Sequence, residues 1–333
     1  MLAPFMNAQE RRVFDLDDIQ LEPWQIAGLD ARVASVGQGP VALFVHGWPE
    51  CWYSWRQQML ALANAGYRAI APDMPGFGQT AGWPQVSDYH MDNTCAFLLD
   101  LIAQCGVESV LLIGHDWGAI NVWGFTLRHP ERVSRLVAMS VPLKPLAEQP
   151  PMQQLRALFK DQFFYQLYFQ RPGVAEAEFD ADPEGILRAL FCSPDTPRAA
   201  PVLGKSIALG GGWIDRLGKP LEQPTWLSDE ALAYYLDSYR HSGFAGGLHY
   251  YRNMDHNWSL NRPYAQTRIE CPVLFLAGSE DYATQRASAE ALLALMGERV
   301  PYLSIRVFPG VGHWLQAEAR AQVNTALLEF IAG

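Results

Sequence analysis

The pentapeptide Gly114-His115-Asp116-Trp117-Gly118 constrains this chain more than any other stretch. It follows an apolar run over 109–113 that predicts a buried strand, and it precedes residues 119–125, which predict a helix. Glycines on both sides of a polar residue allow the sharp turn and close packing of a nucleophile elbow. Such an elbow lifts its central side chain above the edge of a sheet. We therefore expect a nucleophile at Asp116, where Ser is the usual residue.

Strands and helices are predicted to alternate on both sides of this elbow. Two strands within 14–36 come first, and the pattern from 41 to 141 is strand, helix, strand, helix, strand, helix, strand. The alternation resumes near the C-terminus, with strands at 271–277 and 303–308 and helices at 285–296 and 317–331. Such a pattern is typical of a mostly parallel α/β sheet with helices on both faces.

Between Pro142 and Trp258 the alternation stops. Predicted helical pieces are separated by Pro- and Gly-rich segments such as 193–201 and Gly210-Gly211-Gly212, and the pieces are 152–170, 185–192 and 228–242. We interpret 142–258 as a helical cap inserted into a core made of 1–141 and 259–333. An insertion at this point lies over the carboxyl ends of the strands, where open α/β sheets bind ligands.

Composition excludes several classes of partner. The 333 residues carry a net charge of -10, which disfavours nucleic acid and anionic lipid. Five scattered cysteines without CxxC spacing indicate reduced thiols of an intracellular protein. Residues 1–12 have no signal-peptide pattern and no apolar run is long enough to span a membrane, so we expect a cytoplasmic protein. The sequence leaves the oligomeric state open.

Two later loops supply the partners that an elbow needs. In this architecture the chain order is nucleophile, acid, histidine. His313 lies in the loop 310–314 after the last predicted strand, and Asp281 follows the strand before it. We take Asp281 as the acid and leave its neighbour Glu280 open.

The loop His46-Gly47-Trp48-Pro49-Glu50 ends the first strand of the alternating pattern. A loop at this place supplies one backbone N–H of an oxyanion hole, and the residue after the nucleophile supplies the other. The sequence therefore predicts a hole formed by the amides of Trp48 and Trp117. The Trp48-Pro49 bond is a candidate for a cis peptide.

A carboxylate nucleophile indicates chemistry at a saturated carbon. An ionised Asp needs no base for activation, and attack on a saturated carbon gives an alkyl ester of Asp116. His313, oriented by Asp281, would then activate the water that hydrolyses this ester. Epoxides and alkyl halides are the two fitting substrate classes. An epoxide also requires a proton donor, and the phenol of a Tyr keeps its proton at neutral pH.

Together these motifs resemble the α/β-hydrolase-fold epoxide hydrolases of the soluble type, from about Leu21 to the C-terminus. Two cap stretches also carry the resemblance, 164–176 and 250–254. In that family each such stretch provides one Tyr that protonates the epoxide oxygen. The resemblance implies that Tyr165 and Tyr251 fill these roles, with Tyr168 and Tyr250 as alternatives. It also implies that no phosphatase domain precedes the hydrolase, and that substrate contacts come from three residues, His46, Pro49 and Gln166.

A haloalkane dehalogenase is the alternative, because Trp117 is also found there as a halide donor. That family typically has Asn or Glu where Trp48 stands here. A ligand receptor on the same fold is a third reading, disfavoured by the intact nucleophile, acid and histidine. His241 and His249 lack the spacing of metal ligands, so we expect neither metal nor cofactor. The expected partners are a small epoxide and water.

Overall fold

The computed structural model describes residues 13–201 and 212–333. The segment 1–12, where we noted no signal-peptide pattern, lies outside this range. So do Gly210 and Gly211 of the predicted flexible cap loop. None of the helices within the described ranges has the length and apolar character needed to cross a membrane.

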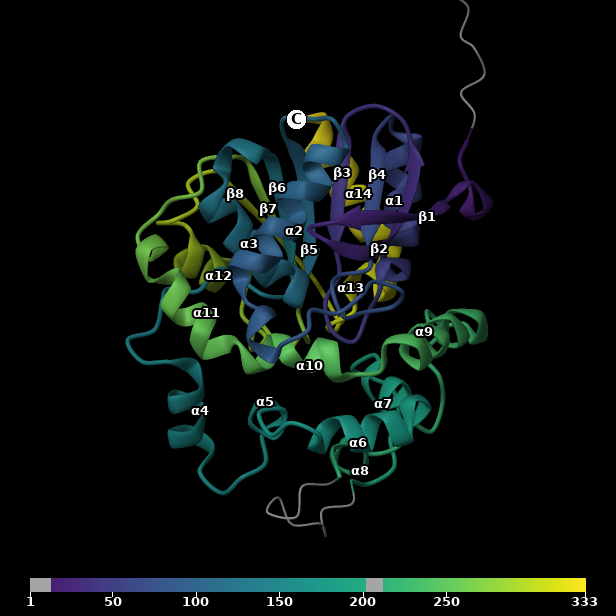
Figure 1. Cartoon of the computed structure of the whole chain (residues 1–333), viewed down its shortest axis with the longest axis vertical. Helices are drawn as coiled ribbons and strands as arrows, with labels where there is room; N and C mark the ends of the chain where they lie inside the picture. The colour runs from purple at the N-terminus through teal and green to yellow at the C-terminus, as the bar shows by residue number, and fades with distance from the viewer. Residues whose placement is uncertain (1–12, 202–211) are drawn as a thin grey trace, which may run out of the picture.

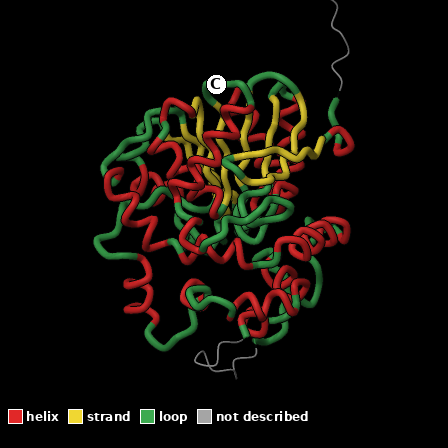
Figure 2. The backbone as a smooth tube through the Cα atoms, in the orientation of Figure 1, coloured by secondary structure: helices red, strands yellow, loops and turns green. Residues whose placement is uncertain are grey.

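An eight-stranded sheet forms the centre of the molecule, in the order β1-β2-β4-β3-β5-β6-β7-β8 (Figure 2). The pairs β1–β2 and β2–β4 are antiparallel and the remaining pairs are parallel, which confirms the predicted mostly parallel sheet. The strands are β1 (Gln20–Ile26), β2 (Leu29–Gly37), β3 (Val41–Val45), β4 (Arg68–Pro72), β5 (Val110–His115), β6 (Val133–Met139), β7 (Val273–Gly278) and β8 (Leu303–Phe308).

Helices cover both faces of the sheet because the central strands are apolar on both sides. In β3, Leu43 and Val45 join the core on one face, and Ala42 and Phe44 join the core on the other. The face of Leu43 is covered by α2 (Met91–Gln104), α3 (Trp117–Arg128) and α12 (Ala289–Met296). The opposite face is covered by α1 (Arg56–Asn64), α13 (Leu315–Glu318) and α14 (Arg320–Ala332).

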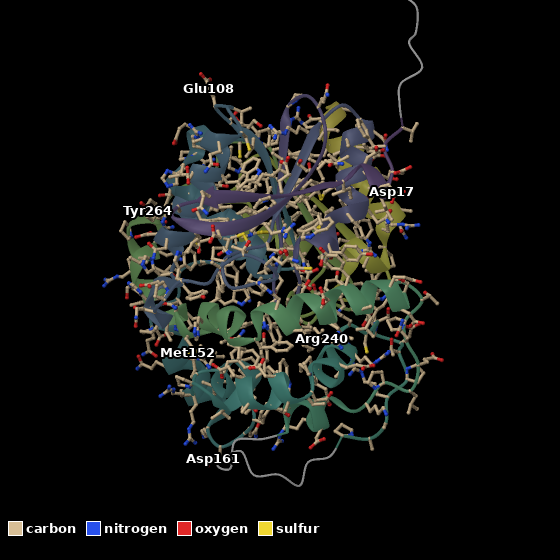
Figure 3. The ribbon with its side chains drawn as sticks, turned by 45° about the vertical axis from the view of Figure 1, so that its right-hand side comes forward. Asp17, Glu108, Met152, Asp161, Arg240 and Tyr264 are labelled. Carbon is tan, nitrogen blue, oxygen red and sulfur yellow. The ribbon has the colours of Figure 1, made fainter. Side chains whose placement is uncertain are left out.

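The chain between β6 and β7 forms a layer of helices at one end of the sheet (Figure 1). Glu108, just before β5, lies at the opposite end of the molecule from Asp161 of this layer (Figure 3). The layer therefore faces the carboxyl ends of the parallel strands. Its helices are α4 (Pro151–Phe159), α5 (Tyr165–Tyr168), α6 (Val174–Ala181), α7 (Pro183–Leu190), α8 (Trp213–Leu217), α9 (Asp229–Ser242), α10 (Ala245–Arg252) and α11 (Met254–Asn261).

Several predicted helices are shorter than expected. The helix over 152–170 is broken after Phe159, where Lys160 has a φ of 47° and the stacked rings of Phe159 and Phe164 hold the chain in a turn. The helix predicted from 285 begins only at α12, because the preceding segment includes two residues with positive φ and Ser288 provides the cap. The C-terminal helix predicted as one piece is interrupted at Ala319, between α13 and α14. At the start of α1, a 3-10 turn covers 52–55, and the hydroxyl of Ser54 pairs with that of Tyr235 instead of capping the helix.

Helix α10 was not predicted because it contains Gly246 and Gly247, which are poor helix formers. Close packing explains both glycines. A Cβ on Gly246 would lie 2.6 Å from the Cα atom of Gly76, and one on Gly247 would lie 2.5 Å from a ring carbon of Trp48. The glycines therefore allow this cap helix to rest directly on two loops of the core.

Candidate active site

Asp116 stands between β5 and α3 with φ 53° and ψ -118°, an unusual backbone conformation for a non-glycine residue. Strain of this kind costs about 1–3 kcal/mol and persists only where neighbouring structure enforces it. Close approaches at three glycines enforce it here. A Cβ on Gly47 would meet the side chain of Asp116, one on Gly114 would meet the backbone of Gly118, and one on Gly118 would meet the carbonyl of Val45. The elbow predicted from the sequence is present.

The carboxylate of Asp116 lies within reach of the predicted oxyanion hole. The backbone N–H of Trp48 donates to Asp116 Oδ1 at 2.8 Å. Trp117 is the first residue of α3, and its N–H is among those at a helix start that have no partner within the helix. The Trp48-Pro49 peptide is cis. Asp116 Oδ2 points instead toward the imidazole of His313.

His313 lies between the two carboxylates. Its Nδ1 is 3.0 Å from Asp281 Oδ1, and its Nε2 is 3.6 Å from Asp116 Oδ2. Burial disfavours the charged imidazolium, but the charges of Asp281 and Asp116 outweigh burial and raise the pKa of His313 to about 10. The two carboxylates therefore favour the protonated form of the imidazole.

Asp281, rather than Glu280, contacts His313. The Asp281 side chain is buried and also accepts a bond from the N–H of Ala283. Burial would raise the pKa of Asp281, but His313 and the hydrogen bonds lower it below its usual value. Glu280 is partly exposed and pairs with Arg286 at 3.2 Å.

Two phenols from the cap, those of Tyr165 at the start of α5 and Tyr251 near the end of α10, lie close enough to be affected by the charge of the Asp116 carboxylate. Their ring centroids are 6.0 Å apart at an interplanar angle of 80°. Burial, and then the charge of Asp116, raise the pKa of both phenols above the usual value. Both phenols therefore keep their protons across the physiological pH range.

The two alternative tyrosines direct their phenols elsewhere. Tyr168 donates to Glu178 at 2.6 Å within the cap. Tyr250 donates to the carbonyl of Pro75 at 3.2 Å, which ties α10 to the core. Each phenol already has an acceptor outside the space above Asp116.

Comparison with known proteins gives the family of this arrangement. Residues 40–319 match the family model described as alpha/beta hydrolase fold. Epoxide hydrolase A of Mycobacterium tuberculosis is 38% identical over 98% of this chain and 99% of its own length. The chain belongs to the α/β-hydrolase-fold epoxide hydrolases.

Other members of this family give the same result. Epoxide hydrolase 2 of Siraitia grosvenorii is 36% identical over 91% of this chain and 95% of its own length. The crystal structure of epoxide hydrolase A from Mycobacterium thermoresistibile has a TM-score of 0.85 and 36% identity, and covers 95% of this chain and 98% of that one. An epoxide hydrolase structure from Vigna radiata has the same TM-score at 34% identity, with 96% and 99% covered.

The three residues that we predicted to bind substrate in this epoxide hydrolase differ in their burial and hydrogen bonds. His46 is buried, its Nδ1 bonds to the carbonyl of Gly47, and its Nε2 accepts the N–H of Met74. Both ring nitrogens are thus used by the backbone, and burial lowers the pKa of His46 to about 4. Pro49 is buried in the cis turn. Gln166 donates to the phenol oxygen of Tyr165 at 2.9 Å and is the one of the three beside a cap phenol.

A network of buried, hydrogen-bonded polar side chains lies behind the site and was not predicted from the sequence. The carboxylate of Glu50 accepts from the N–H of Gly47 at 3.2 Å and from the side-chain amide of Gln316 at 2.6 Å, and it bonds to His115 at 2.8 Å. His115 Nε2 in turn contacts the carbonyl of His313 at 2.8 Å. The network therefore joins the three loops that carry the hole, the nucleophile and the histidine. The only indication of this network in the sequence was the presence of polar residues next to apolar strands.

We predict that Glu50→Gln costs about 3–5 kcal/mol of unfolding free energy at pH 7, because it breaks a buried charged network. Burial raises the pKa of Glu50, but His115 outweighs it and lowers this pKa to about 2. A lowered carboxyl pKa stabilises the folded state above pH 4.5, and that stability is lost as the pH falls toward 2. Urea unfolding should show that the difference in unfolding free energy between the wild type and Glu50→Gln is smaller at pH 3 than at pH 7. Glu329→Gln, at an exposed pair, is the control, and an equal loss there would contradict the prediction.

The position of Tyr282 beside His313 was also not predicted from the sequence. Its ring centroid lies 4.9 Å from that of His313, yet the side chain is 60% exposed. It therefore covers one face of the imidazole at an open side of the site. Its position directly after Asp281 was the only signal in the sequence.

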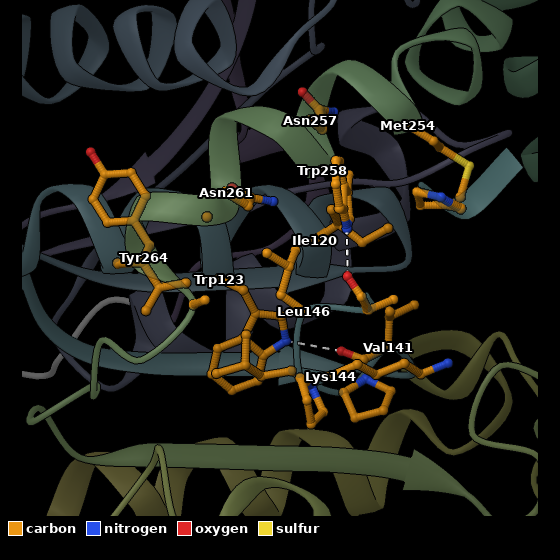
Figure 4. Close-up of a pocket in the computed structure, with 18 of the residues that line it drawn as sticks. Ile120, Trp123, Val141, Lys144, Leu146, Met254, Asn257, Trp258, Asn261 and Tyr264 are labelled. Carbon is orange, nitrogen blue, oxygen red and sulfur yellow. Dashed lines mark hydrogen bonds between the residues drawn. The ribbon is translucent and has the colours of Figure 1, made fainter. Parts of the chain in front are cut away.

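A cavity of about 490 Å³ opens beside the reaction centre (Figure 4). Trp117 and Gln166, the chain neighbours of Asp116 and Tyr165, are among its lining residues. Its walls come from α3, from the segment after β6 and from α11, and are mostly apolar. Indole N–H groups of Trp123 and Trp258 donate to backbone carbonyls of Val141 and Ala147, which holds two of these walls in place. The size and lining suit a small organic molecule.

Proposed function

We propose that this protein hydrolyses epoxides to vicinal diols through a covalent ester on Asp116. The observation that carries the proposal is the position of one carboxylate, with a backbone donor on Oδ1, an imidazole near Oδ2 and two buried phenols within the influence of its charge. A nucleophile, a base and proton donors are the groups that this reaction needs.

In the first half-reaction Asp116 Oδ2 attacks one ring carbon of the epoxide. The carbon–oxygen bond of the ring breaks as the ester bond forms. The ring oxygen, held by Tyr165 and Tyr251, takes a proton from one of the phenols. Oδ1 stays with the amide of Trp48 and becomes the ester carbonyl oxygen.

In the second half-reaction His313 acts as the base. Ester formation removes the negative charge of Asp116, so the pKa of His313 falls, and the imidazolium returns a proton to the phenolate that ring opening left behind. The neutral imidazole then takes a proton from a water molecule, and the hydroxide attacks the ester carbonyl carbon. The amides of Trp48 and Trp117 stabilise the resulting oxyanion, and its collapse releases the diol and restores the carboxylate. Asp281 keeps the imidazole oriented throughout.

The cavity beside Trp117 would hold a substituent of the epoxide. Its apolar walls favour an uncharged hydrocarbon group over a charged one. The partners in this proposal are the epoxide and water, and the protein works in the cytoplasm.

Diol formation tests the function directly. Purified protein should convert at least one of a small, an aromatic and a long-chain epoxide to its diol, and Asp116→Ala should lower the rate at least about 10³-fold because the covalent route is lost. Haloalkanes tested alongside should release no halide. Halide release without diol formation would instead favour the dehalogenase alternative, which the relatives described above do not support.

A further inference from the structure

Two phenols can share one epoxide oxygen only if their separation is fixed. Tyr165 and Tyr251 lie on different helices and are 86 positions apart in the sequence. The ring of Phe169, which is fully buried, packs against both, with centroid distances of 5.5 Å to Tyr165 and 4.9 Å to Tyr251. Apolar packing alone fixes a pair of rings loosely, but polar groups also join α5 to α10.

Arg252 joins the two helices. It directly follows Tyr251 and ends α10, and its side chain is 4% exposed. Its Nε donates to the carbonyl of Phe169 at 2.8 Å, and its Nη2 donates to the carbonyl of Arg171 at 3.4 Å. These carbonyls follow the short helix α5, where carbonyl groups lack partners within the helix. One guanidinium therefore holds the end of the helix that begins with Tyr165.

Other contacts fix this guanidinium in place. Arg252 Nη1 pairs with Glu176 of α6 at 2.6 Å and donates to His249 Nδ1 at 2.8 Å. A planar guanidinium with several fixed donors sets direction as well as distance, which an ammonium group does not. Gln170 adds a second bridge, since its side-chain amide donates to the carbonyl of Gln166 at 2.9 Å and to that of Tyr251 at 3.1 Å.

We propose that Arg252, assisted by Gln170, is a positioning residue that sets the separation of the Tyr165 and Tyr251 phenols for ring opening. The proposal rests on the proposed epoxide hydrolysis. Arg252 touches neither substrate nor Asp116 and acts through the two tyrosines. It serves ester formation, where both phenols act. Ester hydrolysis depends on His313 and Asp281, which the guanidinium does not contact.

Rapid-quench mass spectrometry of the Asp116 peptide separates the two steps, because it follows the ester as it forms and decays. Arg252→Met should slow ester formation about 10- to 100-fold, since small misplacements of reacting groups have effects of this size. Hydrolysis of the ester should stay within about twofold. Arg252→Lys keeps the positive charge but loses the planar guanidinium with its several donors. Its rate of ester formation should lie between those of the wild type and Arg252→Met. Gln170→Leu provides a milder variant if Arg252→Met does not fold.

Arg128→Met is the matched control. Arg128 is also 4% exposed, and its guanidinium bonds to Asp92, Gly124 and Leu260 away from the phenols. It should lose stability without changing the ratio of the two rates.

A double-mutant cycle gives the sharper test. In a Tyr165→Phe background only one phenol remains, so Arg252→Met should have little further effect on ester formation. The positioning role would be overturned if the effects of Tyr165→Phe and Arg252→Met on ester formation were fully additive, or if Arg252→Met slowed ester formation and ester hydrolysis equally. Either result would leave the proposed epoxide hydrolysis intact. A wild-type protein that forms no ester from any epoxide would overturn the proposed function as well.

Discussion

The His313→Gln variant is expected to accumulate an alkyl ester on Asp116 when it is exposed to an epoxide. Ester formation needs the carboxylate and the phenols, which this change leaves in place. Hydrolysis needs the base, and its loss should slow that step about 10²- to 10⁴-fold. The covalent adduct adds the mass of the whole epoxide to the peptide that contains Asp116. Intact-protein and peptide mass spectrometry would detect it.

His241→Gln provides a control, because His241 is an exposed cap residue. The His241→Gln variant should convert the epoxide to its diol at the wild-type rate, and no ester should persist on Asp116. Sustained diol formation by His313→Gln with no adduct at any time would rule out a covalent intermediate that His313 resolves.

Replacing both Tyr165 and Tyr251 by Phe should lower the rate of ring opening about 10²- to 10⁴-fold, because no proton donor then faces the leaving oxygen. Each single variant should lose less, since the other phenol still donates. Stopped-flow fluorescence from the nearby Trp48 and Trp117 indoles would follow ester formation. Circular dichroism should show that the fold survives, because the rings themselves remain.

Tyr168→Phe and Tyr250→Phe are matched controls for this experiment. Their phenols bond to Glu178 and to the carbonyl of Pro75, so their loss should cost about 1 kcal/mol of stability and little activity. If Tyr250→Phe lost ring opening while Tyr251→Phe retained it, the assignment of the proton donor on α10 would have to be exchanged.

The core and the position of the elbow could be predicted from the sequence because they follow from local rules. Apolar strands alternating with helices predict the parallel sheet, and the glycines around Asp116 predict its turn. The loops that hold Asp281 and His313 each follow a strand, so the carboxyl edge of the sheet brings them together.

The cap and the supporting contacts required the three-dimensional structure. Helix α10 contains two adjacent glycines whose purpose is contact with Gly76 and Trp48, and no periodicity reveals that. The network of Glu50 joins residues separated by up to 266 positions. Neighbouring tyrosines such as Tyr250 and Tyr251 differ only in the direction of their phenols, which depends on the turn of the helix that carries them.

Two cap helices border the proposed site, since α10 carries Tyr251 and α4 contributes Gln154 and Leu155 to the cavity lining. The seating of α10 on the core makes these two walls unequal. Gly246 touches Gly76 backbone to backbone, and Tyr250 bonds to Pro75, so changes on this wall would disturb the core. On α4, by contrast, only Met152 is buried and most side chains reach solvent. Substitutions on the α4 wall should therefore be tolerated more readily than substitutions on the α10 wall.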